Sequence, residues 1–395
     1  MKRFLFFLLA VVLFFSCLTA GGVASDDASD EASDGAGFAE TAGEMEIDAR
    51  AAILIEASTG TVLFEQNADE PFSPASVTKV MTLLLVMEAL DAGRIKMSDP
   101  VTVSEHAASM GGSQVFLSPG ESLTVEEMIK CAVISSANDA AVALAEFVSG
   151  SEEAFVSEMN RRATELGMKN ARFENVTGLD DSTVDHRCSA RDVAIMSREL
   201  IFHKDILKYS STWMDSIRDG QFTLTNTNRL IRFYPGATGL KTGSTAKAKF
   251  CLAATAERNR VTLVAVVMGS PSRDVRNEET KRLLDYGFAN YALYSCAKTE
   301  LSPIKTVGGK QDVCRVGHDG FATVVKRGEA AKIQVEYEIP EVLRAPVAVG
   351  ETVGRAIFRT KDGAVGEVPV RAIEAVGRVT FPDLFFRMLR ALVLG

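Results

Sequence analysis

A hydroxyl and an amine stand three residues apart, at Ser76 and Lys79, just before the apolar run 80–87. Ser73 and Pro74 are typical of a helix N-cap and first helical position, so Ser76 is predicted in the first turn, with Lys79 over the same face. The helix is apolar nearly all the way round and should be buried. An isolated serine and lysine at the head of a buried helix suggest a nucleophile and the base that activates it.

The histidines and cysteines offer no other activating group. The four histidines are scattered without ligand spacing, and no CxxC pattern occurs, so neither a metal site, a cofactor nor a Ser-His-Asp triad is expected. Cys296 and Cys314 could pair, but the sequence leaves this open. The histidines are His106, His186, His203 and His318.

Two further runs carry polar groups that could act with Ser76. Ser136-Ala137-Asn138 forms a short break between a helix at 126–133 and another that starts at Ala140, where side chains can turn toward a cleft. Lys241-Thr242-Gly243 lies in a predicted strand. Taken singly, the first run could be helix capping and the second a solvated strand end.

The remaining elements predict one sheet built from distant segments. Residues 51–56 and 61–65 form a hairpin around Ser58-Thr59-Gly60, and strand patterns return only at 237–243, 250–256 and 261–269. A loop at 175–181 and a closing helix at 276–293 complete this part. We therefore expect an α/β (α+β) domain over residues 49–296, with one sheet whose halves lie far apart in the sequence.

The N-terminal residues predict export. Lys2 and Arg3 precede an apolar run that is too short for a permanent span, and small residues offer cleavage after Ala20 or Ala24, so residues 1–24 are interpreted as a signal peptide. A lipoprotein site at Cys17 is the less favoured alternative. Residues 25–48 hold nine acids and no base, which predicts a disordered linker. The net charge of −9 comes mainly from this linker, so nucleic-acid binding is not indicated.

The C-terminal residues predict a second domain and a surface helix. Residues 332–339 alternate between polar and apolar side chains, and with the runs 354–359 and 366–370 they indicate a small all-β domain over 299–376. Residues 382–395 form an amphipathic pattern too short to span a bilayer, which favours a helix lying on the membrane surface. The alternative is a helix that docks on its own β domain.

The three polar runs, in this order, resemble the penicillin-recognising serine enzymes. The resemblance implies the fold of those enzymes, an antiparallel sheet flanked by helices, followed here by the small all-β domain. The sequence around the three runs is similar to that of the low-molecular-mass D-alanyl-D-alanine carboxypeptidases, from about Ala51 to Tyr294. It includes Ala57-x-Thr59-Gly60, Pro74-Ala75-Ser76, Met110-Gly111-Gly112-Ser113 and Asn138-Asp139-Ala140-Ala141. Ala137 departs from the glycine common there, and Ser244 occupies a position that is often histidine or another polar residue.

The resemblance implies a role for each matching residue. Ser76 would be the nucleophile, Lys79 its neutral general base, and Ser136 a proton relay to the leaving D-alanine. Asn138 would hold the substrate amide, and Lys241 would help to lower the pKa of Lys79. The remaining implied contacts to substrate are the cleft strand at Thr242 and Gly243, an oxyanion hole from the N–H groups of Ser76 and Ser244, and a carboxylate contact from Arg276.

The resemblance also implies partners. The substrate would be peptidoglycan stem peptides ending in D-Ala-D-Ala, β-lactam antibiotics would be inhibitors, and the enzyme would work outside the cytoplasm, held at the membrane by its terminal helix. A class A-like β-lactamase is disfavoured because residues 174–179 lack the expected E-x-x-L-N form. A non-catalytic wall-binding scaffold is disfavoured by the intact reacting residues.

Overall fold

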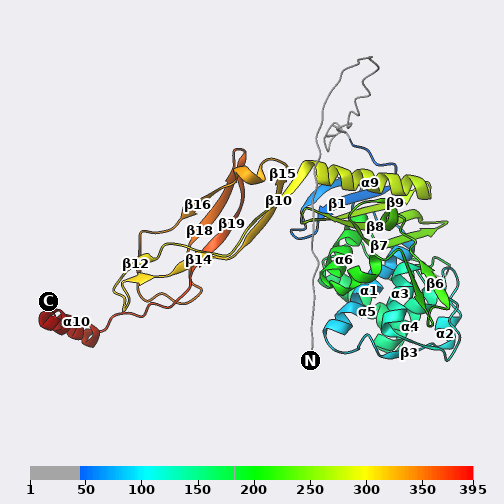
Figure 1. Cartoon of the computed structure of the whole chain (residues 1–395), viewed down its shortest axis with the longest axis horizontal. Helices are drawn as coiled ribbons and strands as arrows, with labels where there is room; N and C mark the ends of the chain where they lie inside the picture. The colour runs from blue at the N-terminus through cyan, green and yellow to red at the C-terminus, as the bar shows by residue number, and fades with distance from the viewer. Residues whose placement is uncertain (1–44, 182, 395) are drawn as a thin grey trace, which may run out of the picture. The chain divides into compact units, whose positions relative to one another are not determined.

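The computed structural model describes residues 45–181 and 183–394. Its larger part is built on a five-stranded antiparallel sheet with the order β2-β1-β9-β8-β7 (Figure 1). The early hairpin and the three late strands therefore share one sheet, as predicted. The strands are β1 (Ala51–Glu56), β2 (Val62–Gln66), β7 (Ala237–Thr245), β8 (Lys249–Arg258) and β9 (Val261–Ser270).

Helices cover both faces of this sheet (Figure 1). The helices of this part of the chain are η1 (Ala75–Thr78), α1 (Lys79–Asp91), α2 (Glu105–Ala108), α3 (Val125–Ile134), α4 (Asn138–Ser149), α5 (Glu152–Glu165), α6 (Ala190–Phe202), α7 (Asp205–Ser210), α8 (Leu230–Phe233) and α9 (Arg273–Asn290). Two small hairpins lie among them, β3 (Pro100–Thr102) with β4 (Ser122–Thr124) and β5 (Met214–Ile217) with β6 (Phe222–Thr225).

The two faces of the sheet belong to different cores because side chains alternate along each strand. Ile53 and Ile55 of β1 lie in a core shared with α1, α3, α4 and α6, whereas Leu54 lies in a second core with Leu283 of α9. The first core buries α1 on every side, so Lys79 at its start has no exposed surface. The burial predicted for this helix is confirmed.

Element ends differ from the predictions where caps or strands intervene. The closing helix, predicted at 276–293, begins after Ser272, whose hydroxyl accepts the Val275 N–H at 3.2 Å. It ends at Asn290 because Tyr291 opens a strand. The helix predicted from Ala140 begins at Asn138 instead.

The C-terminal part is all-β, as predicted. Its five-stranded sheet has the order β11-β14-β19-β18-β16, and Phe321 and Phe358 stack in its core with ring centroids 4.2 Å apart. The predicted limits of the five segments of the chain remain a prediction. The elements are β10 (Tyr291–Cys296), β11 (Thr299–Glu300), β12 (Ile304–Val307), β13 (Val313–Cys314), β14 (Val316–His318), β15 (Phe321–Lys326), η2 (Ala330–Lys332), β16 (Gln334–Glu338), β17 (Val342–Arg344), β18 (Thr352–Thr360) and β19 (Gly363–Ala372).

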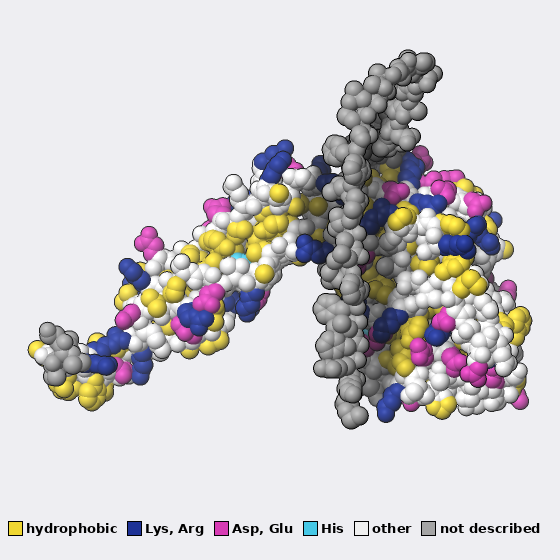
Figure 2. Space-filling model, in the orientation of Figure 1, with side chains coloured by type: hydrophobic (Ala, Val, Ile, Leu, Met, Phe, Trp, Pro, Cys, Tyr) yellow, Lys and Arg dark blue, Asp and Glu magenta, His cyan; other side chains and the backbone are white. Residues whose placement is uncertain are grey.

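The last helix, α10 (Phe381–Leu394), carries exposed apolar side chains (Figure 2). No helix within residues 45–181 or 183–394 is both long and apolar enough to cross a membrane. Cys296 and Cys314 are free thiols, so the pairing that the sequence left open is not formed. The signal peptide at 1–24 and most of the acidic linker lie outside the described residues.

Candidate active site

Ser76 lies in the 3-10 turn η1, which leads directly into α1. The prediction that Ser73 caps this helix is wrong: the turn has no side-chain cap, and the Ser73 hydroxyl instead donates to Asp180 Oδ1 at 2.7 Å. Ala75 has a φ of +47°, in the left-handed region that non-glycine residues rarely adopt. This left-handed conformation of Ala75 puts Ser76 on a tight turn before the regular helix begins. We call residues 73–78 the nucleophile turn.

Lys79 is completely buried and makes three contacts at its amine. Nζ lies 3.1 Å from Ser76 Oγ, 2.5 Å from Asn138 Oδ1 and 3.0 Å from the carbonyl oxygen of Thr177. Burial lowers the pKa of Lys79 from 10.5 to about 7, while the nearby Asp139 carboxylate acts to raise it. The amine therefore changes its protonation state near neutral pH while it faces the serine hydroxyl.

The break between α3 and α4 carries Ser136, as predicted, whereas Asn138 is the first residue of α4. Ser136 has a φ of +63°, and its hydroxyl is buried without a hydrogen-bond partner among the described residues. The side chain of Asn138 is not a helix cap, because its oxygen accepts from Lys79 and its amide donates to the carbonyl of Gly111 at 2.6 Å. Asn138 thus joins the Ser76–Lys79 pair, whereas no hydrogen bond links the Ser136 hydroxyl to that pair.

Strand β7 lies directly against the nucleophile turn. A Cβ atom placed on Gly243 would lie 2.8 Å from the carbonyl oxygen of Pro74 and 3.0 Å from the amide nitrogens of Ser76 and Val77. Only glycine allows the strand to approach the turn this closely. The predicted glycine of the cleft strand is therefore packed beside the predicted nucleophile. Ser244, the next residue, is exposed.

The two residues before Gly243 are buried. Lys241 is 1% exposed, and its amine donates to the Thr242 carbonyl at 2.8 Å. Burial, followed by the charges of Lys79 and Arg276, lowers the pKa of Lys241 well below its usual value. The Thr242 hydroxyl donates to Thr227 Oγ1 at 2.8 Å, a partner that the sequence did not suggest.

Arg276 is a buried cation of α9 that contacts β8. Its guanidinium donates to Asn277 Oδ1 at 2.9 Å and to the carbonyl of Cys251 at 3.4 Å, and Cys251 lies opposite Gly243 in the β7–β8 register. Within the described part of the chain, no carboxylate forms an ion pair with it. Burial and the neighbouring Arg273 lower the pKa of Arg276 to about 10. A positive group so placed is suited to an anionic ligand.

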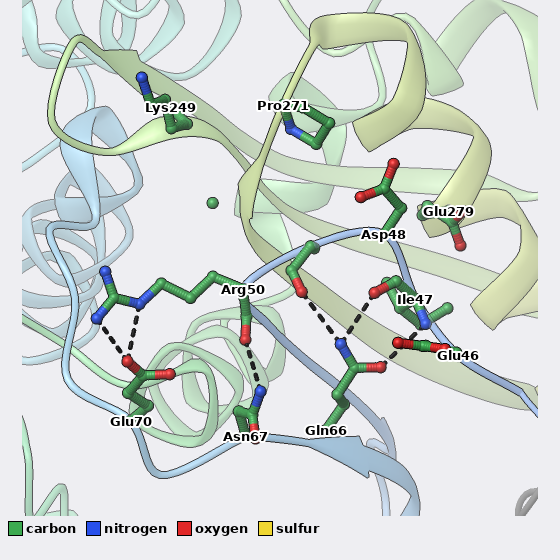
Figure 3. A pocket seen from close by; sticks show the side chains of 12 residues that line it. Glu46, Ile47, Asp48, Arg50, Gln66, Asn67, Glu70, Lys249, Pro271 and Glu279 are labelled. Atoms are coloured by element: carbon green, nitrogen blue, oxygen red, sulfur yellow. Dashed lines mark hydrogen bonds and ion pairs between the residues drawn. The ribbon is translucent and has the colours of Figure 1, made fainter.

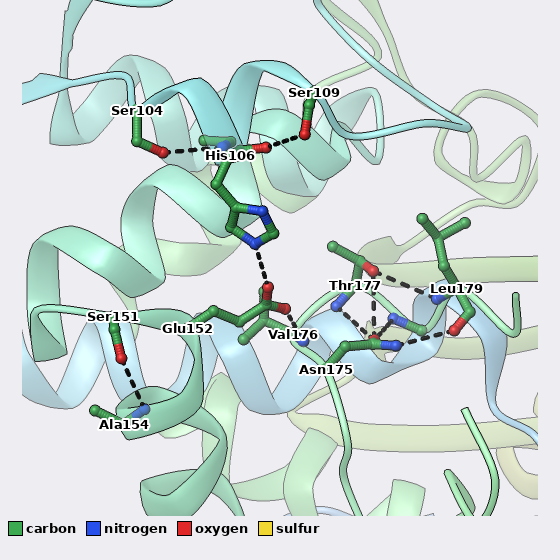
Figure 4. A network of polar contacts seen from close by, with 12 residues as sticks. Ser104, His106, Ser109, Ser151, Glu152, Ala154, Asn175, Val176, Thr177 and Leu179 are labelled. Carbon is green, nitrogen blue, oxygen red and sulfur yellow. Dashed lines mark hydrogen bonds and ion pairs between the residues drawn. The ribbon is translucent and has the colours of Figure 1, made fainter. Parts of the chain in front are cut away.

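Sequence reasoning predicted the loop around 175–181 but missed its contact with Lys79; we call residues 174–181 the Thr177 loop. Its Thr177 carbonyl accepts from Lys79, and a residue that acts through its backbone leaves no sequence signal. Glu152 holds this loop, because its carboxylate accepts the Val176 N–H at 3.1 Å and contacts His106 Nε2 at 2.8 Å (Figure 4). The hydrogen bond to Glu152 raises the pKa of His106.

A prominent cavity of the larger part lies elsewhere. It measures about 990 Å³, and Arg50, Gln66 and Glu279 are among the residues that line it (Figure 3). Arg50 is already paired with Glu70 at 2.5 Å, and Gln66 donates to the Ile47 carbonyl at 2.9 Å. None of the predicted site residues lines this cavity, so its size does not mark the reaction site.

The fold and the Ser76–Lys79 pair define a penicillin-recognising serine enzyme. Penicillin binding protein 5 from Haemophilus influenzae matches with a TM-score of 0.77 at 30% identity, covering 85% of this chain and 99% of that chain. Penicillin binding protein 6B from Escherichia coli matches with a TM-score of 0.69 at 30% identity, covering 84% and 97%. The predicted fold class is therefore confirmed.

The chain belongs to the D-alanyl-D-alanine carboxypeptidase family, whose profile matches residues 38–272. A second profile, the C-terminal domain of penicillin-binding protein 5, matches residues 293–378. D-alanyl-D-alanine carboxypeptidase DacF of Bacillus subtilis is 45% identical over 346 residues, covering 86% of this chain and 88% of the relative. DacC of Escherichia coli is 34% identical over 341 residues, covering 84% of each. The family resemblance is thereby confirmed, and the chain is a serine-type carboxypeptidase of cell-wall metabolism.

Proposed function

We propose that this enzyme removes the terminal D-alanine from peptidoglycan stem peptides through an acyl-enzyme on Ser76. The observation that carries the proposal is the buried Lys79 amine, 3.1 Å from the Ser76 hydroxyl and with a pKa of about 7. In acylation, Ser76 Oγ attacks the carbonyl of the penultimate D-alanine and Lys79 takes its proton. The peptide bond breaks and free D-alanine leaves. Water then hydrolyses the ester and regenerates Ser76.

The three contacts of Lys79 fit a neutral amine. Asn138 Oδ1 and the Thr177 carbonyl oxygen can only accept, so each needs one N–H hydrogen. A neutral amine has two such hydrogens and one lone pair, and the lone pair is then left for the hydroxyl proton of Ser76. This partner set supports Lys79 as the general base and gives Asn138 a second task beside the substrate amide, that of orienting the base.

In this proposal, the other site residues bind the substrate, stabilise the oxyanion or transfer a proton. Ser136, whose buried hydroxyl lacks a partner among the described residues, passes a proton to the departing D-alanine. The N–H groups of Ser76 and Ser244 stabilise the oxyanion, an effect of about 3–4 kcal/mol per donor. The other substrate contacts are the Gly243 backbone beside the peptide, Thr242 and Arg276 at the terminal carboxylate, and Lys241 in the strand that lines the cleft.

The same steps account for acylation by β-lactams, in which the lactam carbonyl takes the place of the peptide carbonyl. A β-lactamase would need a carboxylate in the Thr177 loop that activates water. Glu174 is unsuited to that task, because its two carboxylate oxygens accept the backbone N–H groups of Val184 and Asp185 at 2.7 and 3.1 Å. This pairing of Glu174 favours a carboxypeptidase over a β-lactamase.

The test combines labelling by a fluorescent penicillin with D-alanine release from a peptide ending in D-Ala-D-Ala. Wild type should show both activities and Ser76→Ala neither, while the exposed control Ser211→Ala should match wild type. An unlabelled wild type would contradict the acyl-enzyme. Labelling without release of D-alanine would instead favour a β-lactam-binding protein without carboxypeptidase activity.

We also propose that the enzyme acts outside the cytoplasm and is held at a membrane surface by α10. Seven large apolar residues of this helix are between 47% and 81% exposed, which supports membrane insertion of one face over docking on the β domain. They are Phe381, Leu384, Phe385, Phe386, Met388, Leu389 and Leu392.

The membrane proposal is tested by cell fractionation. Deletion of 382–395 and the double variant Leu384→Glu/Leu392→Glu should both release active enzyme from membranes, while Arg390→Gln should leave most of it bound. Retention of the double variant would show that the apolar face is not what binds.

A further inference from the structure

Asp180, at the end of the Thr177 loop, joins two segments that are far apart in the sequence. Its Oδ1 accepts the Ser73 hydroxyl at 2.7 Å, and its Oδ2 accepts the Thr245 hydroxyl. Thr245 Oγ1 in turn accepts the Ala248 N–H at 2.9 Å. Each carboxylate oxygen therefore receives one hydroxyl, and such charge-assisted bonds are about twice as strong as neutral ones.

The two partners of Asp180 flank the proposed oxyanion hole. Ser73 begins the nucleophile turn, three residues before Ser76, and Thr245 ends β7, directly after Ser244. A carboxylate bonded to both hydroxyls fixes the separation of the turn from the end of the strand. The N–H groups of Ser76 and Ser244 lie one on each side of that junction.

Asp180 is itself held in place by the rest of its loop. A Cβ atom on Gly178 would lie 1.8 Å from the Ala75 carbonyl oxygen, so the loop backbone packs tightly against the nucleophile turn. The Thr177 carbonyl is bonded to Lys79. Within residues 45–181 and 183–394, no cation lies within ion-pair distance of the Asp180 carboxylate. The two hydroxyls are therefore its main partners.

We propose that Asp180 is a positioning residue that holds the nucleophile turn and the end of β7 at the separation needed for acylation of Ser76. The proposal rests on the acyl-enzyme mechanism above. Asp180 touches no reacting atom. Its effect falls on the transition state, in which both N–H groups must meet one oxyanion, and not on ground-state binding.

The test separates the acylation rate constant at saturation from the concentration of penicillin at half-saturation. Asp180→Ala should lower the rate constant roughly 10- to 100-fold, since misplacement by about 1 Å costs on that order, and leave half-saturation nearly unchanged. Asp180→Asn should stay within about threefold of wild type, because its amide oxygen can accept from one hydroxyl and its NH₂ can donate to the other. The exposed neighbour Asp181→Ala is the matched control.

Ser73→Ala identifies the contact involved. This variant lacks one of the two hydroxyls that bond to Asp180. On its own it should acylate more slowly than wild type, but it should add little to the loss caused by Asp180→Ala. A purely structural defect would reduce the fraction of enzyme that is finally labelled and spare the rate constant of the rest. The proposal is overturned if Asp180→Ala acylates at the wild-type rate, if Asp181→Ala is equally slow, or if the two losses multiply in the double variant. An unlabelled wild type would overturn the mechanism instead.

Discussion

The protonation of Lys79 predicts how acylation depends on pH. A lysine pKa of about 7 in place of 10.5 means that burial disfavours the charged form by about 5 kcal/mol. Only the neutral amine can accept the Ser76 proton, so the rate should fall as the pH drops below 7. The neutral fraction is about 9% at pH 6 and about 91% at pH 8. Acylation should therefore rise about tenfold between these values and level off above pH 8.

The assay is the second-order rate constant of labelling by a fluorescent penicillin, whose carboxylate stays ionised from pH 5.5 to 9. Ionic strength is held constant, and near-UV circular dichroism at each pH checks that the enzyme remains folded. An acid limb with its midpoint near 7 is expected. A flat profile across this range, or a rate still rising steeply at pH 9, would refute Lys79 as a base with a lowered pKa.

The variant Lys79→Arg tests the role of Lys79 as the general base without a change of pH. A guanidinium stays protonated throughout this range, so it retains the positive charge but cannot take a proton. Acylation should be abolished at every pH. Any labelling of this variant that follows the wild-type profile would assign the acid limb to another group.

The remaining predictions concern three side-chain positions around this pair. Ser136→Ala should lower D-alanine release at least 100-fold. Its melting temperature should change little, because the Ser136 hydroxyl has no hydrogen-bond partner among the described residues. A large fall in melting temperature would contradict that reasoning. Gly243→Ala should lose both acylation and stability, since its Cβ would meet backbone atoms at 2.8–3.0 Å, and unchanged labelling would refute the close approach of β7. Arg276→Leu should raise KM for a peptide with a free terminal carboxylate but not for the corresponding terminal amide, and an equal rise for both would exclude a carboxylate contact.

Local sequence patterns predicted the scaffold because each pattern reflects a local rule. The hairpin of β1 and β2 follows from apolar runs around a glycine turn, and α3 follows from its apolar period. The positions of Ser76, Lys79 and Asn138 could be predicted because they lie at element boundaries beside apolar runs. Their mutual hydrogen bonds follow once those elements pack.

The contacts that sequence could not give depend on backbone atoms and on distant partners. Ser73 has the residue type of an N-cap, but the left-handed Ala75 changes the turn and leaves the Ser73 hydroxyl free to bond Asp180, 107 residues away. The Thr177 carbonyl meets Lys79 across 98 residues, and any residue type could supply that oxygen. Such contacts are visible only when the whole fold is present.

The site concentrates features that are individually unfavourable. Ala75 and Ser136 both have positive φ values, and Lys79 and Lys241 are buried without a carboxylate within ion-pair distance among the described residues. Each feature costs stability, and local rules would therefore not place it there. The extensive apolar core around α1 offsets that cost, and because a charged amine is expensive inside it, the same core keeps Lys79 neutral beside its serine. The burial of α1 is thus a chemical requirement of the reaction as well as a source of stability: a polar substitution that hydrates the start of α1 should raise the pKa of Lys79 and slow acylation at neutral pH even where the fold survives.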